Sequence, residues 1–509
     1  MFHSKGLRSF GQLLTVVAIL VGMNACGDHR SLPDPATLPD ANFIALNDNN
    51  QLLRFNVRTL SAPSATVSVT GLQSGEQLLA IDFRPATGQL YGIGSTSRLY
   101  VINPTTGTAR AIGAGPFSPA LNGNTVALDF NPTVDRLRLV TNMGQNLRLN
   151  PETGTVVATD GAINGAMGAM IGGAAYTNNK AGVTTTILYD IDPVTDRLYK
   201  QDPPNNGTLA LVGSLGLDIT AVGGFDIGSD GNAIVAVTVS GKSELNQIDI
   251  ATGRLQKLGD LPGNIVGLAI PTEPVAYAVD GSNTLLIFNP MNPAPISKAL
   301  TGLQAGEVIL GIDFRPLNGQ LYALGSSNRL YTINTANGAA AMVGMGFATT
   351  LSGMNYGFDF NPTVDRIRVV GDNGQNLRLH PDTGALVATD GALNPLTPFV
   401  TAGAYTNNFA GTTTTVLYDI DTRAGQSAGL FRQDPPNAGT LVSVGSLGIE
   451  VESANGFDIG GASGTAYALL RSGGLTRVHT IDLATGAATA GSILPAAVTV
   501  RGFAVGLGF

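Results

Sequence analysis

Short apolar runs alternate with clusters of Gly, Pro, Asn and Asp along most of the chain, and this pattern predicts β-strands joined by tight turns. Residues 90–94, 98–103 and 108–113 are three such runs in succession. Alternation of apolar and polar side chains within a run is typical of a strand with one buried face. The chain also has 66 glycines and only 13% charged residues, as a turn-rich chain with many short strands would. We therefore expect an all-β protein.

The runs group into units of four strands that recur about every 40 to 50 residues, a period typical of β-propeller blades. A fifth unit is split, because residues 42–72 supply three strands and residues 264–271 supply a separate opening strand. Pairing of these two segments would close a ring and leave no free sheet edge. The four undivided units of the N-terminal half begin at Leu78, Thr125, Met170 and Ala221.

The two halves of the chain repeat one another. TGLQSGEQLLAIDFRP at 70–85 returns as TGLQAGEVILGIDFRP at 301–316, and DFNPTVDR occurs twice in corresponding places. We expect residues 42–271 and 272–509 to form one β-propeller repeat each, which gives tandem five-bladed β-propellers. The alternative is one ten-bladed β-propeller, because the junction at 272–274 is short enough to lie inside a blade.

The motifs IDFRP, DFNP, GQNLR, AYTNN, LYDID and GFDIG occur in the same order in both halves. This combination resembles a bacterial family known only as domain of unknown function 4394, which is found on exported proteins. The resemblance covers almost all of both halves. It implies two tandem copies of the family's domain and no particular activity.

The N-terminus has the pattern of a bacterial lipoprotein signal peptide over residues 1–25. Lys5 and Arg8 precede an apolar run at 13–21, which is shorter than the roughly 20 residues of a membrane-spanning helix. The next residues resemble a lipobox, so we expect lipidation of Cys26, the only cysteine. Residues 26–41 are polar and proline-rich, and they predict a flexible tether. The alternative is an ordinary signal peptide followed by an incidental cysteine.

These features predict an exported protein at the cell envelope, attached to the membrane through its lipid anchor. Gly27 follows the cysteine, and by resemblance to lipoprotein sorting rules this favours the outer membrane. The formal net charge is −8, and no cluster of Lys and Arg occurs. Because nucleic-acid binding requires such clusters, we expect no nucleic-acid partner.

Few residues suited to catalysis are present. The body has two histidines, His380 and His479, and the counterpart of His380 in the first half is Asn150. A nucleophile, histidine and acid triad in each half is therefore excluded. We expect both histidines to lie at the surface or in turns.

Each half carries three aspartates in opening strands, and strand alternation separates Asp82 from the apolar face of Ile81 and Phe83. If these strands line a central channel, three carboxylates per half converge there and suit calcium. The alternative is that they accept hydrogen bonds from turn amides. The candidate metal ligands are Asp82, Asp129, Asp226, Asp313, Asp359 and Asp458.

Repeated amide and guanidinium groups are candidate ligand-binding residues, because they suit sugars or carboxylates. Ordinary turn chemistry and a polar strand face are the alternative. Asp135 with Arg136 and Arg138 is expected to form an exposed ion-pair edge, and the alternative is that these residues form part of a ligand cleft. The candidates are Arg138, Gln145, Asn146, Arg148, Asn178 and Asn179, with their copies Arg368, Gln375, Asn376, Arg378, Asn407 and Asn408.

These observations favour a non-enzymatic binding or scaffolding module whose loops contact a protein or carbohydrate ligand. The rival hypothesis is a calcium-dependent hydrolase or lactonase that uses a channel carboxylate such as Asp82 or Asp226. A quinone-cofactor dehydrogenase is disfavoured because the chain has no tryptophan to stack on a flat cofactor.

Overall fold

The computed structural model describes residue 1 and residues 38–395, 397–423, 425–452, 456–494 and 498–509. The expected signal peptide beyond Met1, the lipidation residue Cys26 and most of the expected tether lie outside the described residues. Among those that are described, no helix combines the length and the apolar character needed to cross a membrane.

The described residues form ten antiparallel sheets of four strands each, five in each half of the chain. The first half consists of β20 (Ile265–Ala269), β1 (Asn42–Asn47), β2 (Gln51–Asn56) and β3 (Ala65–Ser68); β4 (Leu78–Phe83), β5 (Leu90–Gly94), β6 (Arg98–Ile102) and β7 (Ala109–Ile112); β8 (Val126–Asn131), β9 (Arg136–Thr141), β10 (Asn146–Leu149) and β11 (Val156–Thr159); β12 (Gly173–Tyr176), β13 (Leu188–Asp192), β14 (Arg197–Gln201) and β15 (Leu209–Ser214); and β16 (Ala221–Ile227), β17 (Ala233–Val239), β18 (Lys242–Ile248) and β19 (Leu255–Asp260).

The second half repeats this arrangement. It consists of β40 (Val500–Val505), β21 (Ala276–Asp280), β22 (Thr284–Asn289) and β23 (Asn292–Ala299); β24 (Ile309–Arg315), β25 (Gln320–Gly325), β26 (Arg329–Ile333) and β27 (Ala340–Val343); β28 (Tyr356–Asn361), β29 (Arg366–Gly371), β30 (Asn376–Leu379) and β31 (Leu386–Thr389); β32 (Val400–Tyr405), β33 (Leu417–Asp421), β34 (Gly429–Gln433) and β35 (Leu441–Ser446); and β36 (Gly456–Ile459), β37 (Ala466–Ser472), β38 (Leu475–Ile481) and β39 (Ala488–Ile493). Two single-turn 3-10 helices, η2 (Pro204–Asn206) and η3 (Pro436–Ala438), occupy matching loops.

The split sheet of each half is completed by that half's last strand. β20 pairs with β1, so that Ile44 lies opposite Ala269, and β40 pairs with β21, so that Ala276 lies opposite Val505. The first strands of neighbouring sheets also contact one another in a cycle, β4 to β8, β12, β16, β20 and back to β4. The second half has the same cycle from β24 through β28, β32, β36 and β40. The arrangement is propeller-like.

The core lies between adjacent sheets, and the strand sequences explain why. Inner strands such as β4 are buried at most positions, whereas outer strands such as β3 and β11 alternate between half-buried and exposed positions. Tyr91 of β5 packs edge-on against Phe130 of the next sheet, with ring centroids 5.2 Å apart. Tyr322 and Phe360 repeat this contact at the same separation. Burial of each such side chain stabilises the fold by about 1.5 to 3 kcal/mol.

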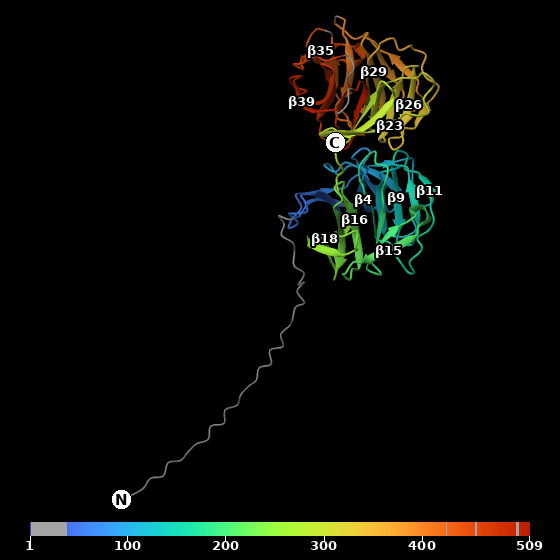
Figure 1. The fold of residues 1–509 in the computed structure, drawn as a ribbon, viewed down its shortest axis with the longest axis vertical. Helices are drawn as coiled ribbons and strands as arrows, with labels where there is room; N and C mark the ends of the chain where they lie inside the picture. The colour runs from blue at the N-terminus through green and yellow to red at the C-terminus, as the bar shows by residue number, and fades with distance from the viewer. Residues whose placement is uncertain (2–37, 396, 424, 453–455, 495–497) are drawn as a thin grey trace.

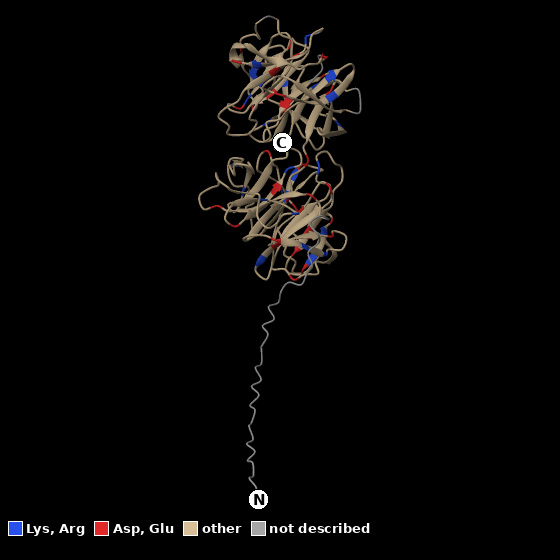
Figure 2. Ribbon diagram, turned by 90° about the vertical axis from the view of Figure 1, so that its left-hand side faces the viewer, with Lys and Arg blue, Asp and Glu red and all other residues tan. Residues whose placement is uncertain are grey.

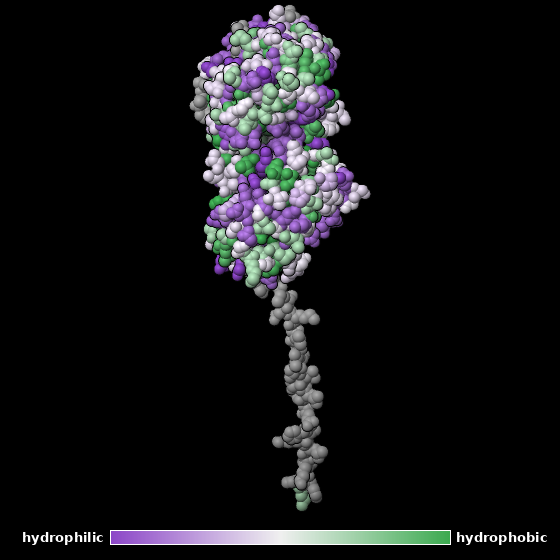
Figure 3. Space-filling model, turned by 90° about the vertical axis from the view of Figure 1, so that its right-hand side faces the viewer, coloured by the Kyte–Doolittle hydropathy of each residue, from purple (hydrophilic) through white to green (hydrophobic). Residues whose placement is uncertain are grey.

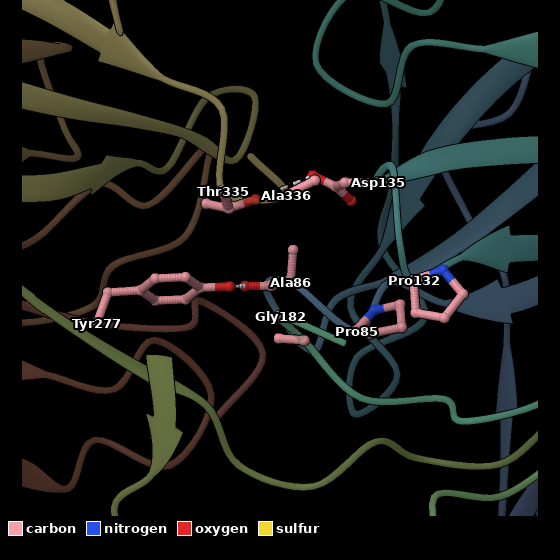
Figure 4. A pocket seen from close by; sticks show the side chains of 9 residues that line it. Pro85, Ala86, Pro132, Asp135, Gly182, Tyr277, Thr335 and Ala336 are labelled. Carbon is pink, nitrogen blue, oxygen red and sulfur yellow. Dashed lines mark hydrogen bonds between the residues drawn. The ribbon is translucent and has the colours of Figure 1, made fainter. Parts of the chain in front are cut away.

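The two halves form two lobes that meet at a waist, where the C-terminus also lies (Figure 1). Figure 4 shows part of this junction, at which the Tyr277 hydroxyl donates to the Ala86 carbonyl at 2.9 Å. The Thr335 hydroxyl donates to the Asp135 carboxylate at 3.3 Å in the same view. The face drawn in Figure 3 mixes hydrophilic and hydrophobic residues on both lobes, and Lys and Arg positions are scattered among those of Asp and Glu along the ribbon in Figure 2.

Candidate functional site

Three aspartates converge inside each half, as the strand alternation predicted. In the first half they are Asp82 of β4, Asp129 of β8 and Asp226 of β16, and one carboxylate oxygen from each lies within 4.8 Å of the others. All are at most 2% exposed. The second half brings Asp313, Asp359 and Asp458 together in the same way. We call these two groups the first and second carboxylate clusters; their role as ion ligands stays a prediction.

Two carboxylates of the first cluster tie neighbouring sheets together. Asp82 accepts the amide of Phe83 on its own strand and that of Phe130 on the adjacent inner strand, both at 2.7 Å. Asp226 accepts the amides of Ile227 and Ile270, both at 2.6 Å. Backbone amides therefore provide hydrogen bonds to both carboxylates, in line with the alternative prediction that these aspartates bind backbone amides.

Asp129 is less well satisfied. It faces the amide of Tyr176, but neither of its carboxylate oxygens has a hydrogen bond of good geometry among the described residues. Its counterpart Asp359 accepts one bond, from the Tyr405 amide at 3.0 Å. Burying a charge without partners is costly, so Asp129 requires a proton or a cation beside it.

Burial and mutual repulsion act on the protonation of both clusters. Burial, followed by the charges of Asp82 and Asp226, raises the pKa of Asp129 well above its usual range. Burial raises the pKa of Asp226 to about 7, although the amides of Ile270 and Ile227 oppose this change. The pKa of Asp458 is raised to about 7 for the same reason. Three close carboxylates cannot all be ionised without compensation, so each cluster takes up protons or a hard cation.

An asparagine lies beside the second cluster. The Asn408 side-chain amide donates to the Ile459 carbonyl at 3.1 Å and lies 3.4 Å from Asp458 Oδ1. Asn408 is 3% exposed, and its Oδ1 has no hydrogen-bond partner in the described part of the chain. Asn179, its copy, is also buried with an unpartnered Oδ1. A half-turn of the Asn408 carboxamide would offer its oxygen to an ion held by the cluster.

The space among the inner strands is small. A cavity in the second half, lined by residues such as Gly311, Gly357, Gly403 and Phe503, has a volume of about 10 Å³. That volume holds no more than about one water molecule. The inner strands therefore leave no room there for an organic substrate.

Both clusters lie at the strand ends that lead into the junction of the two halves. Arg84, two residues after Asp82, donates to the Gly319 carbonyl of the second half at 3.1 Å. The amide of Val505 binds Asp458 at 2.6 Å, and shortly after it Gly508 donates to the Thr87 carbonyl at 2.8 Å. Each half thus covers the cluster-bearing end of the other.

Arg138 is the centre of a buried polar network, which corrects the expected exposed ion-pair edge. It is 1% exposed, and its guanidinium donates to Asn146 Oδ1 and Asp160 Oδ2, both at 2.6 Å. It also donates to Asn205 Oδ1 at 2.7 Å, and Arg148 binds Asp160 from the other side. Arg368, Asn376, Arg378, Asp390 and Asn437 repeat the network. These predicted ligand-binding groups therefore bind partners inside the protein.

The other predicted ligand-binding residues hold turns. Gln145 and Gln375 each donate to a backbone carbonyl at 2.9 Å. Asn178 and Asn407 have positive φ angles of 55° and 58°, and each amide bonds a carbonyl seven residues on. Their role in ligand binding stays a prediction.

Two buried carboxylates were missed by the sequence reasoning. Asp190 of β13 and its copy Asp419 of β33 are fully buried, and their oxygens have no hydrogen-bond partner among the described residues. Burial raises the pKa of each to about 8, although the neighbouring Arg138 or Arg368 opposes it. The repeated LYDID motif, with an acid inside an apolar run, was the available signal. His479 was also placed wrongly, because it is 5% exposed within β38, where burial lowers its pKa.

A family model described as Domain of unknown function (DUF4394) matches residues 51–269 and 284–504, most of the chain. The protein belongs to this family. The two matched regions are the two tandem copies that the repeated motifs predicted. No curated protein shows a significant match.

A crystal structure from Bacteroides uniformis, of a protein described as a 6-phosphogluconolactonase, is similar to this DUF4394 protein at 15% sequence identity. The match covers 65% of this chain and 98% of that chain, with a TM-score of 0.27. At that score the likeness carries no argument about activity.

Proposed function

We propose that this DUF4394 protein is a non-enzymatic binding or scaffolding module at the bacterial cell envelope, built as two closed five-bladed β-propellers. The pairing of β20 with β1 and of β40 with β21 supports two rings. In one ten-bladed ring β20 would pair with β21 instead. The ring arrangement leaves loops on the outer surface free to contact a ligand.

The observation that carries this proposal is the burial of the polar groups suited to catalysis. The carboxylate clusters and Arg138 are at most 2% exposed, and most of their polar atoms bind groups within the protein. A general acid or base must reach within hydrogen-bond distance of its substrate. The buried clusters therefore support a structural role better than a catalytic one.

We infer that each cluster holds one hard divalent cation, with calcium as the candidate, and that the ion joins neighbouring sheets. Carboxylate oxygens, with the Asn408 oxygen in the second half, are ligands that calcium prefers. The unpartnered oxygens of Asp129 support this inference, because an ion would neutralise the charge that burial penalises.

The competing function is a calcium-dependent hydrolase or lactonase that acts through Asp82 or Asp226. Metal analysis of the purified protein, combined with hydrolysis assays on a panel of lactones and esters, separates the two functions. The binding module is expected to hold about two ions per chain and to hydrolyse none of the panel. Calcium-dependent hydrolysis that Asp82→Asn abolishes would overturn it.

The envelope location rests on the predicted lipidation of Cys26. Mass spectrometry of the N-terminal peptide, after expression in a bacterium with a lipoprotein pathway, is expected to show a diacylated or triacylated cysteine. Cys26→Ser should move the protein from the membrane fraction to the soluble fraction. Equal membrane association of the two forms would contradict the lipid anchor.

A further inference from the structure

A cleft of about 290 Å³ lies at the junction of the two halves, and neither the carboxylate clusters nor the Arg138 network lines it. Residues of the first half, among them Val101 and Pro104, form one wall. Loop residues of the second half, among them Phe409 and Leu507, form the other. This volume is close to the lower end of the range of small-molecule sites, about 300 to 1,000 Å³.

The walls of the cleft are largely apolar. Phe409 is 39% exposed, although an aromatic side chain is usually buried, and it stands beside the small residues Ala410 and Gly411. An apolar ligand that covered the Phe409 ring would remove this exposed surface from water, at about 25 cal/mol per Å².

One cation stands at the cleft. Arg110 of β7 donates to the Leu317 carbonyl across the junction and to the Ala111 carbonyl at 3.4 Å. Its Nε is buried without a hydrogen-bond partner, and no carboxylate of the described residues lies within ion-pairing distance of it. Burial lowers the pKa of Arg110, although the charges of Tyr91 and Asp365 oppose this change. Each terminal nitrogen of Arg110 carries a second proton beyond its bond to a carbonyl, and a carboxylate in the cleft would accept hydrogen bonds from these protons.

The internal repeat shows that the fold does not require this cation. Arg110 lies opposite Val101 in its sheet, and Ala341 occupies the same register opposite Thr332 in the second half. The counterpart of Phe409 is Lys180, which forms an ion pair with Glu273 at 3.0 Å. The two halves thus differ at both the cation and the aromatic wall of the cleft.

We propose that the cleft binds an aliphatic carboxylate, with the carboxylate on Arg110 and the chain against Val101, Pro104 and Phe409. Arginine matches the planar geometry of a carboxylate with two parallel hydrogen bonds. The proposal rests on the proposed function as a binding module, because it names the class of ligand that such a module takes.

Calorimetric titration with sodium decanoate below its micelle concentration tests the proposal on the chain from Gly27 to Phe509, which contains all ten sheets. One molecule is expected to bind per chain. Arg110→Ala installs the residue present at position 341, and it should weaken binding about tenfold or more, since hydrogen bonds to charged groups contribute about 1.5 to 3 kcal/mol. Phe409→Ala removes the aromatic wall and should also weaken binding, because less apolar surface of the ligand is covered. Decanol and decyltrimethylammonium should bind far more weakly than decanoate.

Arg477→Ala is the matched control, because Arg477 also donates to a backbone carbonyl, that of Gly491 at 2.7 Å, and lies outside the cleft. Its affinity for decanoate should equal that of the parent protein. Absence of decanoate binding, or equal binding by parent and Arg110→Ala, overturns the cleft proposal. Hydrolysis of lactones by a protein that still binds decanoate at Arg110 would overturn the proposed function and leave the cleft assignment standing.

Discussion

The Asp226 carboxylate accepts the amide of Ile270 at 2.6 Å, which fixes β16 to the residue that follows the closing strand β20. In the second half Asp458 binds the Val505 amide of β40 at the same distance. The acid of each cluster that lies nearest the ring closure therefore also holds the closing strand in place. Because of this double role, the charge state of the clusters affects the stability of each half.

Stability without metal is expected to fall as the pH rises. The pKa of Asp226 and of Asp458 is raised to about 7, so between about pH 4 and 7 the folded protein holds protons that the unfolded chain releases. The free energy of unfolding then decreases with rising pH, by up to about 1.4 kcal/mol per unit for one such group. Thermal unfolding of EDTA-treated protein from pH 5 to 8 measures this. A melting temperature that increased across that range would contradict it.

Calcium should restore the stability lost at high pH. The pKa of Asp226 and of Asp458 is about 7, so at pH 8 these two acids have lost their protons and favour an ion, whereas at pH 5 protons compete with it. We expect calcium to raise the melting temperature markedly at pH 8 and little at pH 5, as measured by calorimetry. An equal effect at both values would show that calcium binds elsewhere.

Removal of one cluster should remove one ion. The triple variant Asp82→Asn, Asp129→Asn, Asp226→Asn is expected to bind about one ion per chain by metal analysis, because the second cluster is untouched. Asp190→Asn is the matched control, since Asp190 is equally buried but lies outside the cluster. Loss of metal from the control to the same extent would point to general destabilisation.

Truncation of Arg138 should be among the most destabilising single changes. Arg138→Ala removes a donor from Asp160, Asn146 and Asn205 at once, and breaking such a buried pair costs about 3 to 5 kcal/mol. Arg148→Ala removes a half-buried partner of the same carboxylate and should cost about 1 kcal/mol or less. Urea unfolding of the two variants measures the difference, and equal losses would refute a network centred on Arg138.

The fragment 38–271 is expected to fold by itself. It contains all five sheets of the first half, including the pairing of β20 with β1. Circular dichroism and a cooperative thermal transition would show this. The exposed junction should lower its melting temperature, because Arg84 loses the Gly319 carbonyl. A fragment without cooperative unfolding would favour one larger ring.

Strand positions and the inward direction of Asp82 could be predicted because alternation and turn residues are local properties of the sequence. β12 shows the limit, since it begins at Gly173 and not at Met170, which is exposed. The alternation of apolar and polar residues predicts on which face of a strand a side chain lies, but it does not predict which other segments cover that face. Arg138 therefore looked like a surface residue, although a loop from the next sheet brings Asn205 to it.

The junction could not be predicted at all, because it depends on contacts between loops that are distant in the sequence. Tyr277 and Ala86 are 191 residues apart, and neither belongs to a motif with a polar role. The cleft at Arg110 exists only because Leu317 and Phe409 reach it from the other half. The sequence repeat shows that Arg110 is replaced by Ala341 in the second half, but only the fold shows that Arg110 lies at a cleft.

Because the last strand of each half completes its split sheet, the two halves can fold one after the other during synthesis. β20 is synthesised before β21, so a chain that emerges N-terminus first can complete the five sheets of the first half while the second half is still unformed. Until β20 arrives, β1 presents an unpaired edge to other chains. The risk of aggregation is therefore greatest while the ribosome synthesises the roughly two hundred residues between β1 and β20.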